Sequence, residues 1–142
     1  MNGLYLIAHI AGRAVAVAAN QVESAVDIGE ITPVPLAGGA VRGLAALRSR
    51  VVTVIDTYFM LGLEAPASAS RRAVVTRVDG HHYAMMVDSL EDVAVFELQP
   101  LSAGTAFDGE WSRAARGIVD RDGEPILVID LSALVPSLAE AA

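Results

Sequence analysis

Hydrophobic residues occur along the whole chain in short runs, rich in valine and isoleucine, that are separated by turn residues. This pattern is typical of many short strands rather than of long helices. Three pairs of runs flank a two-residue turn signal, and each pair predicts a β-hairpin. The expected hairpins are 4–10 with 13–18 across Ala11-Gly12, 74–78 with 83–87 across Asp79-Gly80, and 117–120 with 125–129 across Asp122-Gly123.

A fourth hairpin is expected from the apolar runs 43–47 and 51–55, with a turn near Arg48-Ser49. Several of the expected strands are apolar on both faces, as the core of a barrel or sandwich requires. The Pro33-Val34-Pro35 segment is expected to be extended, because proline fixes its own φ and restricts the residue before it. The small residues of 65–70 predict a link between two halves of the chain.

Short helices are expected where polar residues could cap them. Asn20 and Asp88 each precede a glutamate by three positions, which is the pattern of a capping box. Asp56 and Asp130 each follow an apolar strand and precede a short apolar stretch, as N-cap residues do. We therefore predict structural helix caps at these four positions.

The two halves of the chain resemble each other. The pattern Asn20-x-Val22-Glu23 recurs 68 residues later as Asp88-x-Leu90-Glu91. The stretch RGL at 42–44 with VID at 54–56 recurs 74 residues later as RGI at 116–118 with VID at 128–130. The sequence therefore predicts an all-β fold with short helices, built from two similar lobes in pseudo-twofold relation. Short closed barrels would hide the edges of such strands.

Composition narrows the possible functions. With 142 residues, 54% of them hydrophobic and 19% charged, the chain can form a single domain with a sizeable core. The absence of cysteine excludes disulfides, a thiolate nucleophile and cysteine-based metal sites. A net charge of −7 argues against nucleic-acid binding. No apolar run approaches the roughly 18 residues of a membrane span, so we expect no membrane insertion, and no secretory signal is recognisable.

No group of residues predicts catalysis, a metal site or a cofactor. His81 and His82 are neighbours on an expected strand, so their side chains point to opposite faces and cannot readily share one metal ion. His9 lies within an apolar strand and is expected to be a hydrogen-bonded packing residue. Asp56 and Asp130 could be imagined as paired carboxylates, but helix capping explains their matched positions better. A nucleophile elbow and a phosphate loop are both missing.

Two residues have alternative interpretations that the residues alone leave open. Arg48 lies at an expected turn between two strongly apolar strands, where it is either a solvated arginine or an interface residue that meets a partner's carboxylates. Val22, in the first expected capped turn, is either part of the core or an exposed hydrophobic contact.

The stretch ITPVP at 31–35, followed by VRGLAALRSRVVTVID at 41–56, resembles the signature of the CheW-like coupling proteins. The start of the chain, the stretch 87–93 and the closing strand and helix are also similar to this family, so the resemblance covers nearly the whole chain. The sequence departs from the usual family residues at four positions, which are Ser24, Ala46, Ser49 and Thr53.

The resemblance implies a single CheW-like domain over 1–142, formed by two SH3-like five-stranded β-barrel lobes. Lobe one would extend over about 13–64 and lobe two over about 71–130, with the terminal strands and helix completing the barrels.

The resemblance also implies a function: a non-catalytic cytoplasmic adaptor, without cofactor, in chemotaxis or related signal transduction. Such an adaptor couples the regulatory domain of a CheA-type histidine kinase to the cytoplasmic tip of methyl-accepting chemoreceptors. Val22, Gly43 and Arg48 match family positions associated with partner contact. We therefore expect an exposed apolar patch along Val22 and the 43–48 hairpin. The alternative is a small-ligand-binding or sensory regulator that reuses the fold, although strands that are apolar on both faces argue against a polar-lined interior.

Overall fold

The computed structural model describes residues 2–33, 41–47, 50–63, 72–101, 111 and 114–135. Several features expected from the sequence lie outside these residues. They are Arg48 and Ser49 of the hairpin turn, Val34 and Pro35 of the proline segment, and the link over 65–70.

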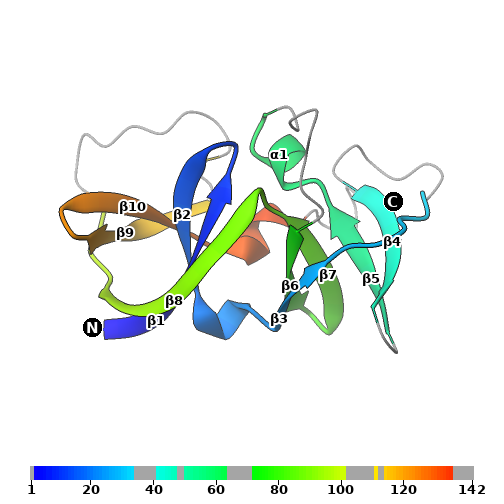
Figure 1. Cartoon of the computed structure of the whole chain (residues 1–142), viewed down its shortest axis with the longest axis horizontal. Helices are drawn as coiled ribbons and strands as arrows, with labels where there is room; N and C mark the ends of the chain where they lie inside the picture. The colour runs from blue at the N-terminus through cyan, green and yellow to red at the C-terminus, as the bar shows by residue number, and fades with distance from the viewer. Residues whose placement is uncertain are drawn as a thin grey trace.

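The strands form two five-stranded sheets that lie side by side (Figure 1). Sheet A has the strand order β8-β1-β2-β10-β9 and sheet B has the order β3-β6-β7-β5-β4. The strands of sheet A are β1 (Asn2–Ile10), β2 (Arg13–Ala18), β8 (Ser89–Glu97), β9 (Ala115–Arg121) and β10 (Glu124–Ile129). The strands of sheet B are β3 (Ser24–Asp27), β4 (Val41–Leu47), β5 (Arg50–Ile55), β6 (Arg72–Val78) and β7 (His81–Met86).

Three short helical segments connect or end these strands. The 3-10 turn η1 (Ala19–Gln21) joins β2 to β3, the α-helix α1 (Thr57–Met60) follows β5, and the 3-10 turn η2 (Leu131–Leu134) follows β10. The prediction of an all-β fold with short helices is therefore confirmed.

The two sheets are equivalent in topology, which confirms the pseudo-twofold relation. Each contains one parallel pair, β2 with β10 in sheet A and β7 with β5 in sheet B, and the remaining pairs are antiparallel. In each sheet the chain that follows the first edge strand bridges back to the last one, through Thr32 with Leu44 in sheet B and Gln99 with Ile118 in sheet A. These bridges curl each sheet towards a barrel.

The predicted hairpins are present, and three of them have turns of the type I′ form. Both central residues of each turn have a positive φ, as this turn requires. The angles are 53° and 79° at Ala11 and Gly12, 51° and 81° at Asp79 and Gly80, and 51° and 89° at Asp122 and Gly123. Local turn chemistry thus fixes these hairpins.

The expected boundaries of the lobes are wrong, because the two sheets do not follow the two halves of the chain. Strand β2, placed in lobe one, belongs to sheet A, where Val15 pairs with Leu127 of β10. Strands β6 and β7, placed in lobe two, belong to sheet B, where Tyr83 pairs with Thr53 of β5. The first hairpin of each half therefore completes the sheet of the other half. This exchange depends on parallel pairs between distant segments, which no local pattern encodes.

Two of the four expected caps are also wrong. Asn20 lies inside η1, whose N-cap residue is Ala18 and has no side-chain hydrogen bond. Asp88 precedes a strand, β8, rather than a helix. In contrast, the Asp56 carboxylate at the N-cap of α1 accepts a hydrogen bond from the Phe59 N–H, and Asp130 does the same for Ser132 in η2.

The main hydrophobic core is shared by both sheets. It includes Val17 and Ile129 from sheet A, Val54 and Met85 from sheet B, and the fully buried Tyr58 from α1. A second cluster belongs to sheet A and consists of Tyr5, Ile7, Ala16, Val119, Ile126 and Val128. Because one core joins the sheets, their relative position, and any surface that spans both, is fixed by packing.

Candidate protein-interaction site

The outer face of the β4–β5 hairpin is apolar and exposed. Leu44 is 38% exposed and Val51 is 62% exposed. Ala46 lies directly opposite Val51 in the ladder and is also exposed. We call Leu44, Ala46 and Val51 the hairpin face. Side chains alternate along a strand, so their neighbours Ala45 and Val52 point inward and are buried.

A groove of about 600 Å³ lies between β3 and the β4–β5 hairpin. Strands β3 and β4 are the two outermost strands of sheet B, and no ladder of hydrogen bonds joins them. Unpaired edges offer backbone N–H and C=O groups to another chain. The residues that line this β3–β4 groove are Glu23, Ser24, Ala25, Val26, Asp27, Ala46, Leu47, Arg50 and Val75.

Charged side chains surround the groove. The Arg50 guanidinium lies 3.3 Å from the Glu23 carboxylate, and Nε2 of His82 lies 2.9 Å from the same oxygen. Nε2 of His82 also contacts Nη1 of Arg50, so this nitrogen donates to Glu23 in one tautomer and accepts from Arg50 in the other. This cluster joins β5 and β7 to the residue before β3.

Of the three residues expected to contact partners, Val22 is half-buried and packs against the main core. It is the C-cap residue of η1 and directly precedes Glu23, whose N–H donates to the Val75 carbonyl at 2.8 Å. Val22 therefore lies next to the groove in the chain, but it is not among the residues that line it.

Gly43 is required by the backbone of the hairpin. It has a φ of +147°, and a Cβ at this position would lie 2.3 Å from the Thr32 carbonyl oxygen. The close approach allows the two hydrogen bonds between Thr32 and Leu44, at 2.8 and 2.9 Å. Gly43 therefore sets the shape of β4 beside the hairpin face. Arg48 lies outside the described residues, but its neighbours Leu47 and Arg50 both line the groove.

Asp88 holds three elements together where the chain passes from sheet B to sheet A. Its carboxylate accepts hydrogen bonds from the Tyr58 hydroxyl of α1 and from the Gly12 N–H at 2.8 Å. Its own N–H donates to the His9 carbonyl at 2.7 Å. Burial raises the pKa of Asp88, but the hydrogen bonds from Tyr58, Gly12 and Ala11 outweigh it and hold the pKa below its usual value. Burial and the contact with Asp88 raise the pKa of Tyr58.

Asp130 and Gln21 form the corresponding contact at the other passage between sheets. The Gln21 amide donates to the Asp130 carboxylate at 2.6 Å, and its oxygen accepts from the Leu131 N–H at 3.1 Å. Burial raises the pKa of Asp130, but hydrogen bonds from Ser132 and Gln21, with the charge of Arg116, hold it below its usual value.

The remaining histidines do not assemble a metal site. The His81 ring lies edge-on to Tyr83, whereas His82 bonds Glu23, so the neighbouring histidines point to different surroundings. His9 bonds Glu91, whose pKa is lowered by the hydrogen bonds from His9 and Arg121. Within the described ranges, no group of three or more potential ligands could hold a metal ion. Nor do these ranges contain a helix long and apolar enough to cross a membrane.

Sequence reasoning missed the role of two glutamates. Glu23 and Glu91, interpreted as parts of capping boxes, instead bind an arginine and a histidine each, Arg50 with His82 and Arg121 with His9. The two glutamates occupy equivalent positions in the repeat, and this equivalence was the sign in the sequence that they share a role. The partners come from strands that are distant in the sequence, so the sequence could not name them.

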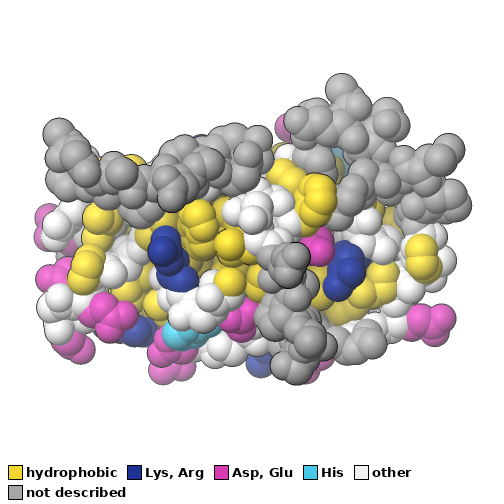
Figure 2. Space-filling model, turned by 90° about the horizontal axis from the view of Figure 1, so that it is seen from above, with side chains coloured by type: hydrophobic (Ala, Val, Ile, Leu, Met, Phe, Trp, Pro, Cys, Tyr) yellow, Lys and Arg dark blue, Asp and Glu magenta, His cyan; other side chains and the backbone are white. Residues whose placement is uncertain are grey.

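The fold and the family match together define the class of protein. Two equivalent SH3-like sheets share one core. On the face seen in Figure 2, apolar side chains reach the surface across the middle, and acidic side chains lie mainly along the lower edge. The chain also matches the family model of the CheW-like domain over residues 4–139. It therefore belongs to the CheW-like domain family, and the resemblance seen in the sequence is confirmed.

Individual relatives agree with this assignment. The chain is 23% identical over 126 residues to a "Chemotaxis protein CheW" of Thermotoga maritima, covering 89% of this chain and 83% of the relative. It is 26% identical over 108 residues to a protein of the same name from Rhizobium meliloti, covering 75% and 70%. The crystal structure of the scaffolding protein TtCheW from Thermoanaerobacter tengcongensis has a similar fold, with a TM-score of 0.82, 21% identity and coverage of 100% and 98%.

Proposed function

We propose that this protein is a non-catalytic adaptor of the cytoplasm that couples a CheA-type histidine kinase to chemoreceptors. In this proposal, the β3–β4 groove and the hairpin face together receive one of the two partners. Family membership supports the proposal, since relatives in two bacteria are named as chemotaxis proteins.

The observation that carries the proposal is the exposed apolar hairpin face beside a groove with open strand edges. Large apolar side chains that remain exposed next to one another mark interaction surfaces. Open edges and an adjacent groove suit a peptide segment or helix of a partner protein. The charged cluster of Glu23, Arg50 and His82 borders the groove, where it would fix the orientation of the partner.

The equivalent hairpin of sheet A differs on its outer face. Asp120 occupies the place of Ala46, 74 residues later, and Pro125 occupies the place of Val51. A charged residue in the middle of this face disfavours an apolar contact. This difference between the hairpins supports the hairpin of sheet B as the contact site for the partner.

The experiment that tests the proposal is a titration of the protein with the regulatory domain of its own organism's CheA-type kinase, and separately with a chemoreceptor tip fragment. The double variant Ala46→Asp with Val51→Asp gives the hairpin face a polar character. We expect it to weaken the binding of one of the two partners by about a hundredfold, roughly 2.7 kcal/mol. Arg48→Ala is expected to weaken the same interaction and to leave the melting temperature unchanged.

A matched control is Phe59→Ser, because Phe59 is 55% exposed on α1 and does not line the groove. It should leave both affinities unchanged. If the wild-type protein binds neither partner, the proposed function is wrong. If both partners bind the double variant as well as the wild type, the adaptor function stands and the assignment of the hairpin face is wrong.

A further inference from the structure

The turn between β6 and β7 consists of an aspartate followed by a glycine. Asp79 and Gly80 are both exposed and have φ angles of 51° and 81°. In such a pair the aspartate side chain reacts readily with the next backbone amide, because glycine carries no side chain that shields its nitrogen. Asp122 and Gly123 form the same pair in the turn between β9 and β10, and they are exposed too. Each sheet thus contains one turn with the same reactive pair.

The amide nitrogens of the two glycines have different surroundings. The Gly123 N–H donates a hydrogen bond to the Asp120 carboxylate at 2.7 Å. Asp120 lies two residues before the aspartate of its turn, and the equivalent position before Asp79 is occupied by Arg77. An arginine side chain has no acceptor, and within the described ranges no group accepts from the Gly80 N–H. A carboxylate therefore holds one turn amide, and the other has no such bond in this part of the chain.

We propose that Asp79 is a site of covalent modification, where the chain converts slowly and without an enzyme to isoaspartate. The Gly80 nitrogen attacks Cγ of Asp79 and forms a C–N bond. A carboxyl oxygen leaves as water, with the acid proton and the amide proton, and a five-membered imide remains. One water molecule then opens the imide. Cleavage of the new bond restores aspartate, and cleavage of the original peptide bond leaves the chain connected through Cβ and Cγ, which is isoaspartate.

The hydrogen bond to Asp120 slows the same reaction in the other turn for two reasons. The bond must break before the Gly123 nitrogen can attack Asp122. The negative charge of the Asp120 carboxylate also disfavours the loss of the amide proton. Both turns are exposed hairpin tips, where local opening is available to each. The difference in reactivity therefore comes from the amide and its acceptor.

The modification reaches the β3–β4 groove through His82. Isoaspartate adds one methylene group to the main chain at the tip of the β6–β7 hairpin. His82 follows Asp79 by three residues and lies opposite Arg77 in the ladder, and its Nε2 lies 2.9 Å from the Glu23 carboxylate. A longer turn changes how the two strands meet, so the contact between His82 and Glu23 should loosen. Glu23 lines the groove, so an effect on a partner rests on the proposed function, whereas the modification itself does not.

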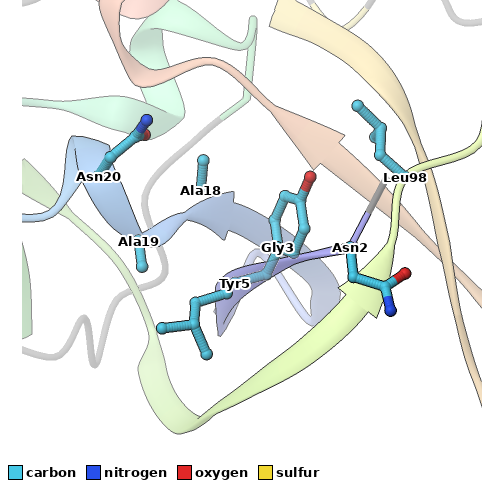
Figure 3. Close-up of a pocket in the computed structure, with 8 residues that line it drawn as sticks. Asn2, Gly3, Tyr5, Ala18, Ala19, Asn20 and Leu98 are labelled. Atoms are coloured by element: carbon cyan, nitrogen blue, oxygen red, sulfur yellow. The ribbon is translucent and has the colours of Figure 1, made fainter.

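Another pair that can form an imide is Asn2 with Gly3, at the start of β1. Figure 3 shows both residues beside a hollow of about 580 Å³. Gly3 pairs with Phe96 of β8, so this reaction requires the end of the ladder to open. It also releases ammonia and changes the mass of the chain, whereas isomerisation of Asp79 leaves the mass unchanged. The two reactions can therefore be measured separately.

The first experiment incubates the purified full chain at physiological temperature and pH for several weeks. Isoaspartate is located by mass spectrometry of tryptic peptides with electron-transfer fragmentation. It is quantified by methylation of its α-carboxyl group with an isoaspartyl methyltransferase. We expect isoaspartate to form at Asp79 at least about tenfold faster than at Asp122. Absence of isoaspartate at Asp79, or a rate at Asp122 that is equal or higher, would overturn the proposal.

A reciprocal pair of variants tests the cause of the difference. Arg77→Asp supplies the missing acceptor to the first turn, and Asp120→Arg removes the acceptor from the second. Both positions are exposed, so the fold should persist, and the melting temperature checks this. We expect about tenfold slower isomerisation of Asp79 in the first variant and about tenfold faster isomerisation of Asp122 in the second. An unchanged rate in either folded variant would show that the hydrogen bond does not control the reaction.

NMR of the histidine rings tests the consequence without any partner. The isoaspartate form is separated from the unmodified chain by chromatography. We expect the ring signals of His82 to shift in this form, whereas those of His9, which bonds Glu91 in sheet A, stay in place. Unchanged signals of His82 would show that the modification does not reach the groove, and that part of the proposal would be wrong. Neither experiment uses a kinase or a receptor, so failure of the adaptor function would leave these results unaffected.

Discussion

Sheets A and B share their internal construction. In each, a glycine, Gly43 or Gly117, allows the segment after an edge strand to approach closely. A Cβ at the glycine would lie 2.3 or 2.6 Å from a carbonyl oxygen of that segment. In each, an arginine beside this glycine lies near the capping aspartate, at 3.7 Å between Arg42 and Asp56 and 3.2 Å between Arg116 and Asp130. These features repeat because each sheet must close on itself through the same contacts.

The outer surfaces of the two sheets differ instead. The β1–β8 pair exposes Leu4 and Val95 where the β3–β6 pair carries Arg72 and Asp27. The β4–β5 hairpin exposes apolar residues where the β9–β10 hairpin carries Asp120. Exposed positions can hold either apolar or charged side chains, so folding does not determine which kind is present. The two sheets therefore share their internal geometry and differ in their surface chemistry, with each sheet apolar at a place where the other is charged.

The largest difference between the sheets should appear when their equivalent glycines are replaced. Gly43→Ala combines a backbone clash with an unfavourable φ and should cost about 4 kcal/mol of unfolding free energy. Gly117→Ala has the steric contact without a positive φ and should cost about 2 kcal/mol. Urea denaturation measures both. Gly29→Ala, with open space around its Cβ, is the control, and equal costs at 43 and 117 would contradict the distinction.

The two passages between the sheets should differ in how much one hydrogen-bonding side chain stabilises each of them. The folded pKa of Asp88 is lowered, so its stabilisation is present above the unfolded pKa of about 3.9 and is lost as pH falls through the folded value. Asp88→Asn should therefore cost about 2 kcal/mol at pH 7 and less as the pH falls below about 4.

Gln21→Ala, at the other passage, leaves Asp130 with Ser132 and Arg116 and should cost about 1 kcal/mol. Denaturation curves at several pH values measure both variants, with the exposed Asp92→Asn as the control. A cost of Asp88→Asn that is the same at pH 3 and pH 7 would show that the Asp88 carboxylate is not the stabilising group.

The three type I′ turns allow a smaller comparison. Ala11 has a φ of 53°, and Asp79 and Asp122 have nearly the same φ in their own turns. Aspartate and asparagine adopt this left-handed conformation at a lower free-energy cost than alanine. Ala11→Asn should therefore raise the unfolding free energy by about 1 kcal/mol, and Asp79→Ala should lower it by a similar amount. Thermal unfolding checks both changes. A destabilising Ala11→Asn would indicate that contacts of the asparagine side chain with Asp88 outweigh the gain in the backbone.

The smallest effect concerns the ion pair of Asp27 and Arg72, which lies in sheet B at the register position that Leu4 and Val95 occupy in sheet A. Both side chains of the pair are exposed, so a double-mutant cycle of Asp27→Ala and Arg72→Ala should give a coupling energy of about 0.5 kcal/mol. This coupling should fall further in about 1 M salt. A coupling well above about 1 kcal/mol would mean that the pair is needed for folding, and then Leu4 and Val95 could also be required by the fold.

The hairpins, the repeat and the family could all be predicted from short-range patterns of residues. Asp79-Gly80 and Asp122-Gly123 act within four residues, so their effect can be predicted without the rest of the chain. Asp56 and Asp130 could be predicted as caps for the same reason, since an N-cap bonds a residue two or three positions away.

Which strands share a sheet, and which polar residues meet, depends on long-range packing. Val15 pairs with Leu127, and Asp88 bonds Tyr58 and Gly12, all across long stretches of chain. The same local pattern, a small polar residue three positions before a glutamate, became a 3-10 turn at Asn20 and the start of a strand at Asp88. Capping contributes only about 1 kcal/mol, so sheet pairing and core packing override it.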